Sequence, residues 1–350
     1  MLFDYSKITT ISLLILFTSC QPETAGPCTF EQALHGQAPY PLGFAADVAA
    51  FRFDPDYQNH SSFHFNSITA ENALKMEHIQ PARGGFEFVQ ADSLVNLALR
   101  KGMRVHGHTL IWHNQNPPWL STFSGDRQAW IDLMKEHINT VIQHFSGRIH
   151  SWDVVNEAFE DNGDLRETVW RNGIGDDYIE LAFQFAAEAD PDAMLFYNDY
   201  NLWRKSAKCR AVLALAEHLQ KKGIPIQGIG FQGHIDIRGP GQREIELALE
   251  ELSALGLQVH ISELDVSVNP LGKASPDLEG NFGKQAEVYR MVAEAYTSSV
   301  PADQQFGITF WGLADAHSWI PSFFNRADAP LLWDANYMPK PALCGFMDGI

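Results

Sequence analysis

The sequence predicts a single (β/α)₈ TIM barrel, and three observations support this fold class. Segments rich in β-branched and aromatic residues alternate with amphipathic helical segments, which is typical of a parallel sheet covered by helices. Eight such strands fit within the 350 residues, as a TIM barrel requires. Unusual polar and aromatic residues follow the strands, and in this barrel all strands end at the face that carries the active site.

The expected strands are short and mostly apolar, and a helix follows most of them. The strands are expected at 42–46, 63–68, 102–110, 149–155, 194–197, 226–231, 257–261 and 306–310. The helices are expected where apolar residues recur at helical spacing, at 91–99, 127–145, 177–189, 205–222, 244–255 and 284–297. Gly223 and Gly256 stop two of these helices. No low-complexity linker follows residue 28, so we expect no second domain.

The first residues are expected to be an export signal and not part of the fold. Lys7 precedes an apolar run at 8–17, which has the length of a signal peptide and is too short to span a membrane. Ser19 and Cys20 end this region, and a small residue before a cysteine at that place is similar to a bacterial lipoprotein signal. The sequence therefore predicts that Cys20 carries a lipid.

This interpretation divides the chain into a signal peptide at 1–19, a tether at 20–29 and a catalytic domain at 30–350. The alternative is an ordinary secretion signal cleaved near Ser19 or Ala25, in which Cys20 has no role. Both interpretations export the protein. With the lipid, the protein is expected to be anchored to a bacterial membrane, on its periplasmic side or at the cell surface, and without the lipid it is expected to be secreted.

The charge and the cysteines restrict the other partners. The net charge is -18, with 25 Lys and Arg against 43 Asp and Glu, which argues against nucleic acid because that partner requires a basic surface. Cys28 and Cys344 lie near the two ends of the mature chain, and a disulfide between them is one possibility in an oxidising compartment. Cys209 is expected to be buried in a helix, and the protein is expected to be a monomer.

The residues after the strands form the predicted functional site. They are Glu71, Asn72, His108, Trp112, Asn156, Glu157, Tyr200, Gln232, His234, Glu263 and Trp311. Each of them alone also has an ordinary structural explanation; Glu157, for example, could simply favour the positive N-terminus of a following helix. Their shared position at one face of the barrel is the evidence that they act together.

Two of these residues, Glu157 and Glu263, predict hydrolysis of a glycosidic bond. One carboxyl group protonates the leaving oxygen, and the other attacks the sugar carbon or activates water. The two groups lie about 5–5.5 Å apart in retaining enzymes and about 6.5–9.5 Å apart in inverting ones. His234 and Asp265 are placed to orient Glu263 and keep it ionised as the nucleophile. Glu157 is then the acid and base, and Asn156 is placed to hold a carboxylate or a sugar hydroxyl.

Several longer motifs occur in the order that a known family has. They are Thr-Ala-Glu-Asn-Ala-Leu-Lys at 69–75, Gly-His-Thr-Leu-Ile-Trp-His at 107–113, Trp-Asp-Val-Val-Asn-Glu-Ala at 152–158, Gln-Gly-His at 232–234, Ser-Glu-Leu-Asp at 262–265 and Phe-Trp-Gly-Leu-Ala-Asp at 310–315. From about residue 30 to the end, the chain resembles glycoside hydrolase family ten. The resemblance implies an endo-1,4-β-xylanase that acts on xylan and xylo-oligosaccharides with retention, and it implies no cofactor.

The resemblance also implies roles for the residues around the two carboxyl groups. Glu71, Asn72, Lys75 and Gln115 would bind the xylose before the cleaved one, and His108, Asn156, Gln232 and His234 would surround the cleaved sugar. Trp311 and Trp319 would close over the glycone side, and Tyr200 would lie on the aglycone side. The sequence departs from the family at Met76, where Trp is frequent, and at His106, where Arg is common.

Three alternatives remain open at this point. His106 and His108 could bind zinc, but we expect them to face opposite sides of a strand, which would not chelate one ion. The barrel could bind sugar without catalysis, although such a protein is expected to lack one of the two glutamates. It could also act on cellulose or on mixed substrates, which a comparison of xylan with carboxymethylcellulose would separate.

Overall fold

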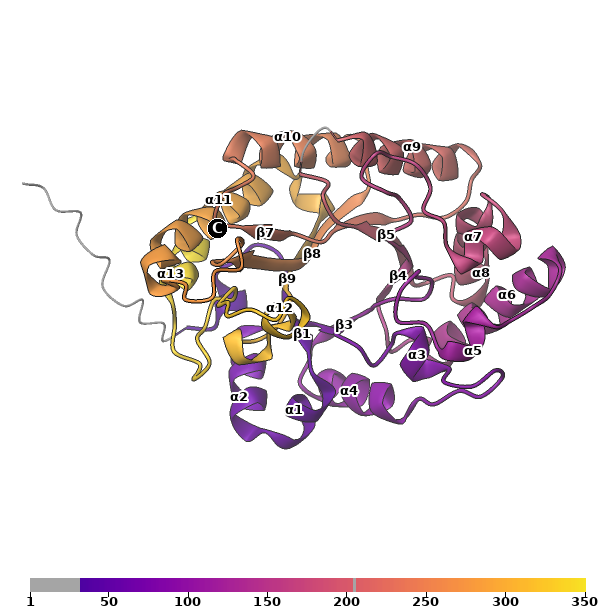
Figure 1. Ribbon diagram of the computed structural model, residues 1–350, viewed down its shortest axis with the longest axis horizontal. Coiled ribbons are helices and arrows are strands. Elements are labelled where there is room, and N and C mark those ends of the chain that lie inside the picture. The colour runs from indigo at the N-terminus through magenta and orange to yellow at the C-terminus, as the bar shows by residue number, and fades with distance from the viewer. Residues whose placement is uncertain (1–31, 204–205) are drawn as a thin grey trace, which may run out of the picture.

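A closed barrel of eight parallel strands forms the centre of the molecule (Figure 1). The computed structural model describes residues 32–203 and 206–350, so the expected signal peptide, Cys20, the tether and Cys28 lie outside the described residues. The barrel strands are β1 (Leu42–Ala46), β2 (Ser67–Ala70), β3 (Arg104–Gly107), β4 (Ser151–Asn156), β5 (Met194–Asp199), β6 (Gly228–Phe231), β8 (Gln258–Ser267) and β9 (Gln305–Phe310). The (β/α)₈ fold class predicted from the sequence is confirmed.

The strands follow one another around the barrel in chain order. Pairing of β6 with β8 and of β9 with β1 completes the ring, with β8 and β9 adjacent to each other. A short additional strand, β7 (His234–Asp236), pairs with the second half of β8. Since every pair is parallel, the carboxyl ends of all strands lie at the same face of the barrel.

Helices surround the barrel in Figure 1. They are α1 (Val48–Phe53), α2 (Pro55–His64), α3 (Met76–Ile79), α4 (Val89–Arg100), α5 (Pro118–Ser121), α6 (Arg127–Phe145), α7 (Val169–Ile174), α8 (Tyr178–Ala189), α9 (Ala207–Lys221), α10 (Gln242–Ser253), α11 (Phe282–Ser299), α12 (Trp319–Phe323) and α13 (Pro341–Asp348). The helix expected at 127–145 coincides with α6, and Asp126 caps it by accepting from the Ala129 backbone N–H at 2.9 Å.

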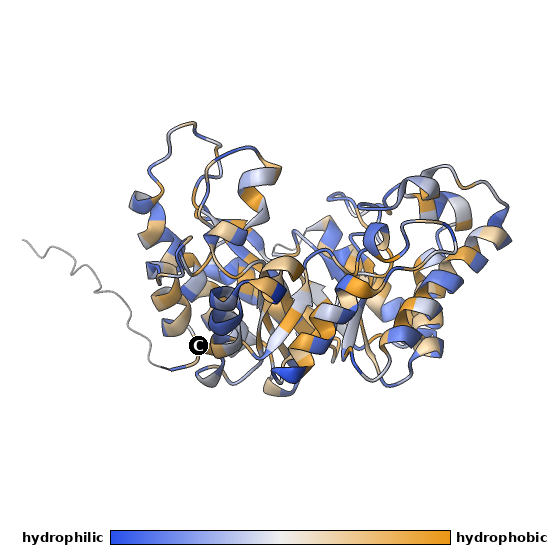
Figure 2. Cartoon of the chain, turned by 90° about the horizontal axis from the view of Figure 1, so that it is seen from below, coloured by the Kyte–Doolittle hydropathy of each residue, from blue (hydrophilic) through white to orange (hydrophobic). Residues whose placement is uncertain are grey.

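The core lies between the strands and the inner faces of these helices. Figure 2 shows hydrophobic residues along the central strands and a mixture of hydrophobic and hydrophilic residues along the outer helices. Trp152, on β4, and Phe145, on α6, are both buried, and the centres of their rings lie 6.2 Å apart. Within the described residues no helix is long and apolar enough to cross a membrane.

The strand expected at 102–110 is shorter than predicted, since β3 covers only Arg104–Gly107, and two other strands differ more from their predicted bounds. The strand expected at 63–68 begins only at Ser67, because α2 continues to His64 after its start at Pro55, whose capping residue is Asp54. The strand expected at 257–261 continues to Ser267, so Glu263 lies within β8 and not after it. The register of β8 against β9 shifts between Ile261 and Leu264, and this irregularity surrounds Glu263.

The cysteines agree with the sequence as far as they are described. Cys209 is buried in α9. Cys344, on α13, takes part in a disulfide bond. Because Cys28 lies outside the described residues, the pairing of Cys28 with Cys344 stays a prediction.

Candidate active site

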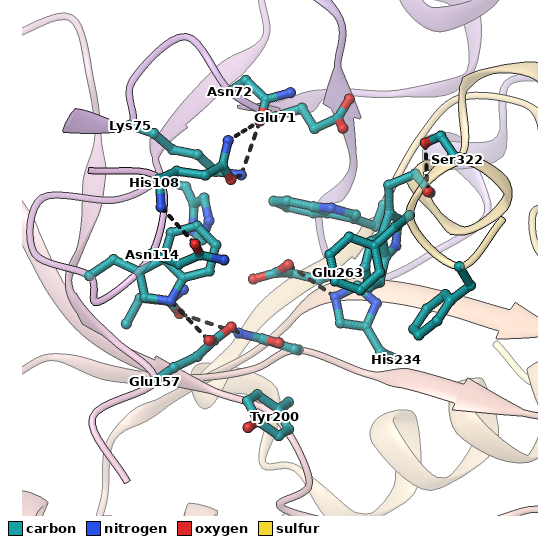
Figure 3. A pocket seen from close by; sticks show the side chains of 18 of the residues that line it. Glu71, Asn72, Lys75, His108, Asn114, Glu157, Tyr200, His234, Glu263 and Ser322 are labelled. Atoms are coloured by element: carbon teal, nitrogen blue, oxygen red, sulfur yellow. Dashed lines mark hydrogen bonds and ion pairs between the residues drawn. The ribbon is translucent and has the colours of Figure 1, made fainter. Parts of the chain in front are cut away.

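One cavity of about 890 Å³ opens at the carboxyl ends of the strands and contains nearly all of the predicted site residues (Figure 3). The predicted residues that line it are Glu71, Asn72, Lys75, His108, Trp112, Gln115, Asn156, Glu157, Tyr200, Gln232, His234, Glu263, Trp311 and Trp319. Asp265 does not line the cavity and lies behind His234. Residues from the ends of different strands therefore meet here, as expected from their positions in the sequence.

Glu263 is a buried carboxylate held at both oxygens. Its Oε1 accepts from Asn198 Nδ2 at 2.8 Å, and its Oε2 lies 3.2 Å from His234 Nε2. The residue is 4% exposed. Burial raises the pKa of Glu263, but His108, His234 and Asn198 outweigh burial, and the pKa lies below its usual value. Glu263 is therefore ionised at neutral pH in spite of being buried.

His234 supplies the positive charge beside Glu263. Its Nδ1 lies 2.9 Å from Asp265 Oδ2, and the same oxygen accepts from Trp319 Nε1 at 2.9 Å. Burial lowers the pKa of His234, but Asp265 and Glu263 outweigh burial and raise it to about 10. His234 is thus an imidazolium that donates to two carboxylates. The chain of contacts from Glu263 through His234 to Asp265 that the sequence predicted is present.

Glu157 has a different environment, made of neutral donors. Its Oε2 accepts from Trp112 Nε1 at 2.9 Å, and its Oε1 accepts from Gln232 Nε2 at 2.9 Å. The nearest imidazole, that of His113, is 3.9 Å from Oε2. The backbone of Glu157 has a φ of 55°, a left-handed conformation that is uncommon for a residue other than glycine. This turn directly after β4 places the carboxyl group at the mouth of the barrel.

Asn198 joins the two halves of the site, and sequence reasoning missed it. Its Nδ2 donates to Glu263 Oε1 and also lies 2.9 Å from Asn156 Oδ1. Its Oδ1 accepts from Ser262 Oγ at 2.7 Å, so the amide cannot rotate freely. Asn198 is buried on β5, near the end of that strand. The rule of polar residues at strand ends could have found it, because Asn198 directly follows the strand expected at 194–197.

A second polar group lies beside the carboxylates, on the segments that follow β2 and β3. Lys75 Nζ donates to Gln115 Oε1 at 2.6 Å and to Asn72 Oδ1 at 3.1 Å, and Gln115 Nε2 donates to Glu77 Oε1 at 2.9 Å. Lys75 is 6% exposed, and burial lowers its pKa, an effect that Glu263 and Glu71 oppose. Burial also raises the pKa of Glu71. These side chains present amide, ammonium and carboxyl groups of the kind that bind sugar hydroxyls.

His108 is fixed by a buried carboxylate, which corrects one expectation. Asp153 Oδ2 lies 2.9 Å from His108 Nδ1, and Asp153 Oδ1 lies 3.1 Å from His106 Nε2. The two histidines therefore approach the same residue, and the expectation that they face opposite sides was wrong, because residues two apart on a strand share a face. Burial raises the pKa of Asp153, but the two histidines lower it below its usual value. Within residues 32–203 and 206–350, no group of three or more His, Cys, Asp or Glu is arranged to hold a metal ion.

Tyr200 lies at the other end of the cavity from Asn72 in Figure 3. Its hydroxyl accepts from Arg166 Nη2 at 3.0 Å, and Lys208 Nζ lies 3.4 Å from the centre of its ring. Lys208 also pairs with Asp199 at 3.2 Å. Burial raises the pKa of Asp199 to about 6, against the effect of Lys208. The ring of Tyr200 is therefore held from two sides by cations.

The two remaining tryptophans of the predicted site lie beside histidines of the cavity, whereas the two residues that depart from the family pattern lie outside the cavity. Trp311 is 6% exposed and lies 5.3 Å from the His108 ring, and Trp319 lies 5.1 Å from the His234 ring. Met76 and His106, where the sequence departs from the family, are buried and do not line the cavity. These two departures therefore change the packing behind the site and not the cavity wall.

The fold and the paired carboxyl groups define a glycoside hydrolase built on a (β/α)₈ barrel. The family model for glycosyl hydrolase family 10 matches residues 30–349. Endo-1,4-beta-xylanase B of Thermotoga neapolitana is 40% identical over 337 residues, which are 94% of this chain and 94% of that protein. The chain belongs to glycosyl hydrolase family 10.

Solved structures give the same result. Native xylanase 10B from Thermotoga maritima aligns with a TM-score of 0.85 and 39% identity, over 90% of this chain and 96% of that one. Xylanase 10B from Thermotoga petrophila, solved in complex with xylobiose, aligns with a TM-score of 0.84 and 38% identity, over 91% of this chain and 97% of that one.

Proposed function

We propose that this protein is an endo-1,4-β-xylanase that hydrolyses internal bonds of xylan with retention of configuration. One observation carries the proposal: Glu157 and Glu263 line the same cavity, and only Glu263 has a cationic partner that keeps it ionised. An ionised carboxylate in the free enzyme suits a nucleophile, and a carboxyl group among neutral donors suits the acid and base. The names of the relatives at about 40% identity support the substrate.

The proposed reaction has two steps. In the first, a Glu263 oxygen attacks the anomeric carbon, the bond from that carbon to the leaving oxygen breaks, and Glu157 gives its proton to that oxygen. In the second, Glu157 takes a proton from water, and the water oxygen replaces Glu263 on the same carbon. Each step inverts the configuration, so the product keeps the configuration of the substrate.

The proposed preference for xylose comes from the wall of the glycone side. Xylose lacks the hydroxymethyl group of glucose. Trp311 and Trp319 lie close to His108 and His234, and Trp319 is fixed through its Nε1 by Asp265. A Trp that is held in place leaves no room for an extra hydroxymethyl group and rejects glucose units by steric clash.

Two measurements on the purified enzyme test the proposal. Release of reducing sugar from xylan is expected to exceed release from carboxymethylcellulose, and equal rates would contradict the assignment to xylan. Proton NMR during the first minutes of hydrolysis is expected to show the β-anomer before mutarotation. The α-anomer as the first product would contradict retention and would favour an inverting arrangement of the same two glutamates.

Export and lipid attachment at Cys20 are part of the proposal. The apolar run at 8–17 and the Ser19-Cys20 sequence support an N-terminal lipid anchor, which would hold a monomeric enzyme at the membrane surface. Expression of the full chain in a bacterium is expected to place the enzyme in the membrane fraction, and Cys20→Ser is expected to release it. Equal distribution of the two proteins would contradict lipidation and leave an ordinary secretion signal.

A further inference from the structure

Two exposed phenylalanines extend the wall of the cavity beyond Trp319. Phe323 and Phe324 lie at the end of α12, line the same cavity as the two glutamates, and are 68% and 48% exposed. Their rings lie 4.9 Å apart and are nearly perpendicular, at 81°. The Trp319 ring lies 5.0 Å from Phe323 and 5.6 Å from Phe324. Three aromatic rings thus form a corner that is open to solvent and continuous with the cleft.

The corner lies to the side of the path that the main chain of a polysaccharide would take. Figure 3 shows Asn72 at one end of the cavity and Tyr200 at the other, with Glu263 between them. Ser322, which directly precedes the two phenylalanines, lies on the opposite side of Glu263 from Lys75. A group bound in this corner would therefore be a substituent on the main chain and not a further sugar of the main chain itself.

The corner has no charge to offer an acidic substituent. The Arg326 guanidinium lies 4.7 Å from the Phe324 ring, but Asp328 pairs with it at 3.2 Å and Ser267 Oγ accepts from it at 3.1 Å. The Ser322 hydroxyl donates to the Trp319 carbonyl at 2.9 Å. A uronic acid would therefore find its carboxylate without an uncompensated cation.

An aromatic group fits this corner better than a sugar. Phenylalanine has no hydrogen-bonding atom, so the hydroxyls of a sugar side group would have few partners here. A flat aromatic ring could stack on one phenyl ring and meet the edge of the other, which are the two arrangements that aromatic pairs prefer.

We infer that Phe323 and Phe324 form a side pocket that binds an aromatic acyl ester carried by a side group of the xylan main chain. The inference rests on the proposed function, because it specifies which decorated xylan the same cleft prefers. The contact is made in the bound substrate and in the transition state alike, so it lowers KM and leaves kcat unchanged.

The test compares two substrates that differ only in the acyl group. They are a xylo-oligosaccharide that carries one arabinofuranosyl side group and the same compound with a feruloyl ester on that group. For the unmodified enzyme, kcat/KM is expected to be about tenfold higher on the acylated substrate, mainly through KM. In the double variant Phe323→Ser/Phe324→Ser, the ratio of kcat/KM on the acylated substrate to kcat/KM on the unacylated one is expected to fall to about one.

Phe53→Ser is the matched control, because Phe53 is 73% exposed on α1 and does not line the cavity. It is expected to keep the ratio of the unmodified enzyme. A ratio of one in the unmodified enzyme, or an unchanged ratio in the double variant, would overturn the inference. Failure of the unmodified enzyme to cleave the substrate without the acyl group would instead overturn the proposed function.

Discussion

The two glutamates of the cavity have the same chemical group but opposite surroundings. Glu263 is buried on β8, and its oxygens contact an amide and an imidazolium whose charge Asp265 supports. Glu157 follows β4, and its oxygens accept from an indole and an amide, both of which are neutral. The carboxylate of Glu263 thus belongs to a network of charged groups, whereas the carboxyl group of Glu157 is held by neutral hydrogen-bond donors.

This difference shows how one site assigns two roles to one residue type. A nearby cation stabilises an ionised carboxylate and resists its protonation. The neutral donors on Glu157 fix the position of its carboxyl group without placing a positive charge beside it, and proton transfer in both directions is the role that remains for this group. If this comparison is correct, removing each glutamate, or the residues that hold it, will have a different and recognisable effect.

The largest effect is expected for Glu263→Ala. Loss of the nucleophile is expected to lower kcat on xylan by roughly 10⁵-fold, since no other group can form the covalent intermediate. Added azide is expected to restore part of the turnover of an aryl xyloside by entering the vacated space, with inversion at the anomeric carbon. Residual activity near one per cent without azide, in a variant whose circular dichroism is unchanged, would show that another group is the nucleophile.

Glu157→Ala is expected to have an effect that depends on the leaving group. On xylan, kcat/KM is expected to fall about 10²–10⁴-fold, because the leaving sugar requires a proton. On a xylobioside with a dinitrophenyl leaving group, kcat/KM is expected to change little, because that group leaves without protonation. An equal loss on both substrates would mean that Glu157 only maintains the structure of the site.

A smaller effect with a specific pH signature is expected for Asn198→Ala. The variant loses one hydrogen bond to a charged group, so kcat/KM is expected to fall roughly 10–100-fold. Asn198 contributes to lowering the pKa of Glu263, so its removal is expected to shift the acidic limb of the kcat/KM profile to higher pH. Ser262→Ala, which removes only the contact to the Asn198 oxygen, serves as the milder control. A loss of rate without the shift would assign Asn198 to packing alone.

The sequence predicts the barrel because its signals are local. Most strands are apolar runs, and the long helices have a periodic apolar face with recognisable ends, as at Gly223 and Gly256. Most of the site follows from one topological rule, that parallel strands end at the same face. Because all strands run in the same direction, residues as distant in the sequence as Glu71 and Trp311 line one cavity, although no local pattern in the sequence shows that they meet.

The remaining features depend on contacts that no local pattern contains. Asn198 acts through Glu263, which lies 65 positions further along the chain. Glu263 itself lies inside a strand, because pairing with β7 extends β8 beyond the apolar run that was visible in the sequence. The sequence alone does not predict the side pocket at Phe323, because two adjacent phenylalanines are more often part of a core. The pocket follows only from the exposure of the two side chains and the arrangement of their rings in the structure.

The smallest effect concerns stability, and it tests the charge of His234. The pKa of this imidazole is about 10 in the folded protein and about 6.5 in an unfolded chain. A raised pKa contributes stability that is fully present below the unfolded value and is lost as the pH rises through the folded value. The free energy of unfolding of the unmodified protein, relative to that of His234→Gln, is therefore expected to decrease by on the order of 2 kcal/mol between pH 8 and pH 10. Urea unfolding of both proteins at each pH measures this difference, in which the titration of distant groups cancels. A constant difference would mean that His234 is neutral, and the contrast between the two glutamates would then rest on hydrogen bonds alone.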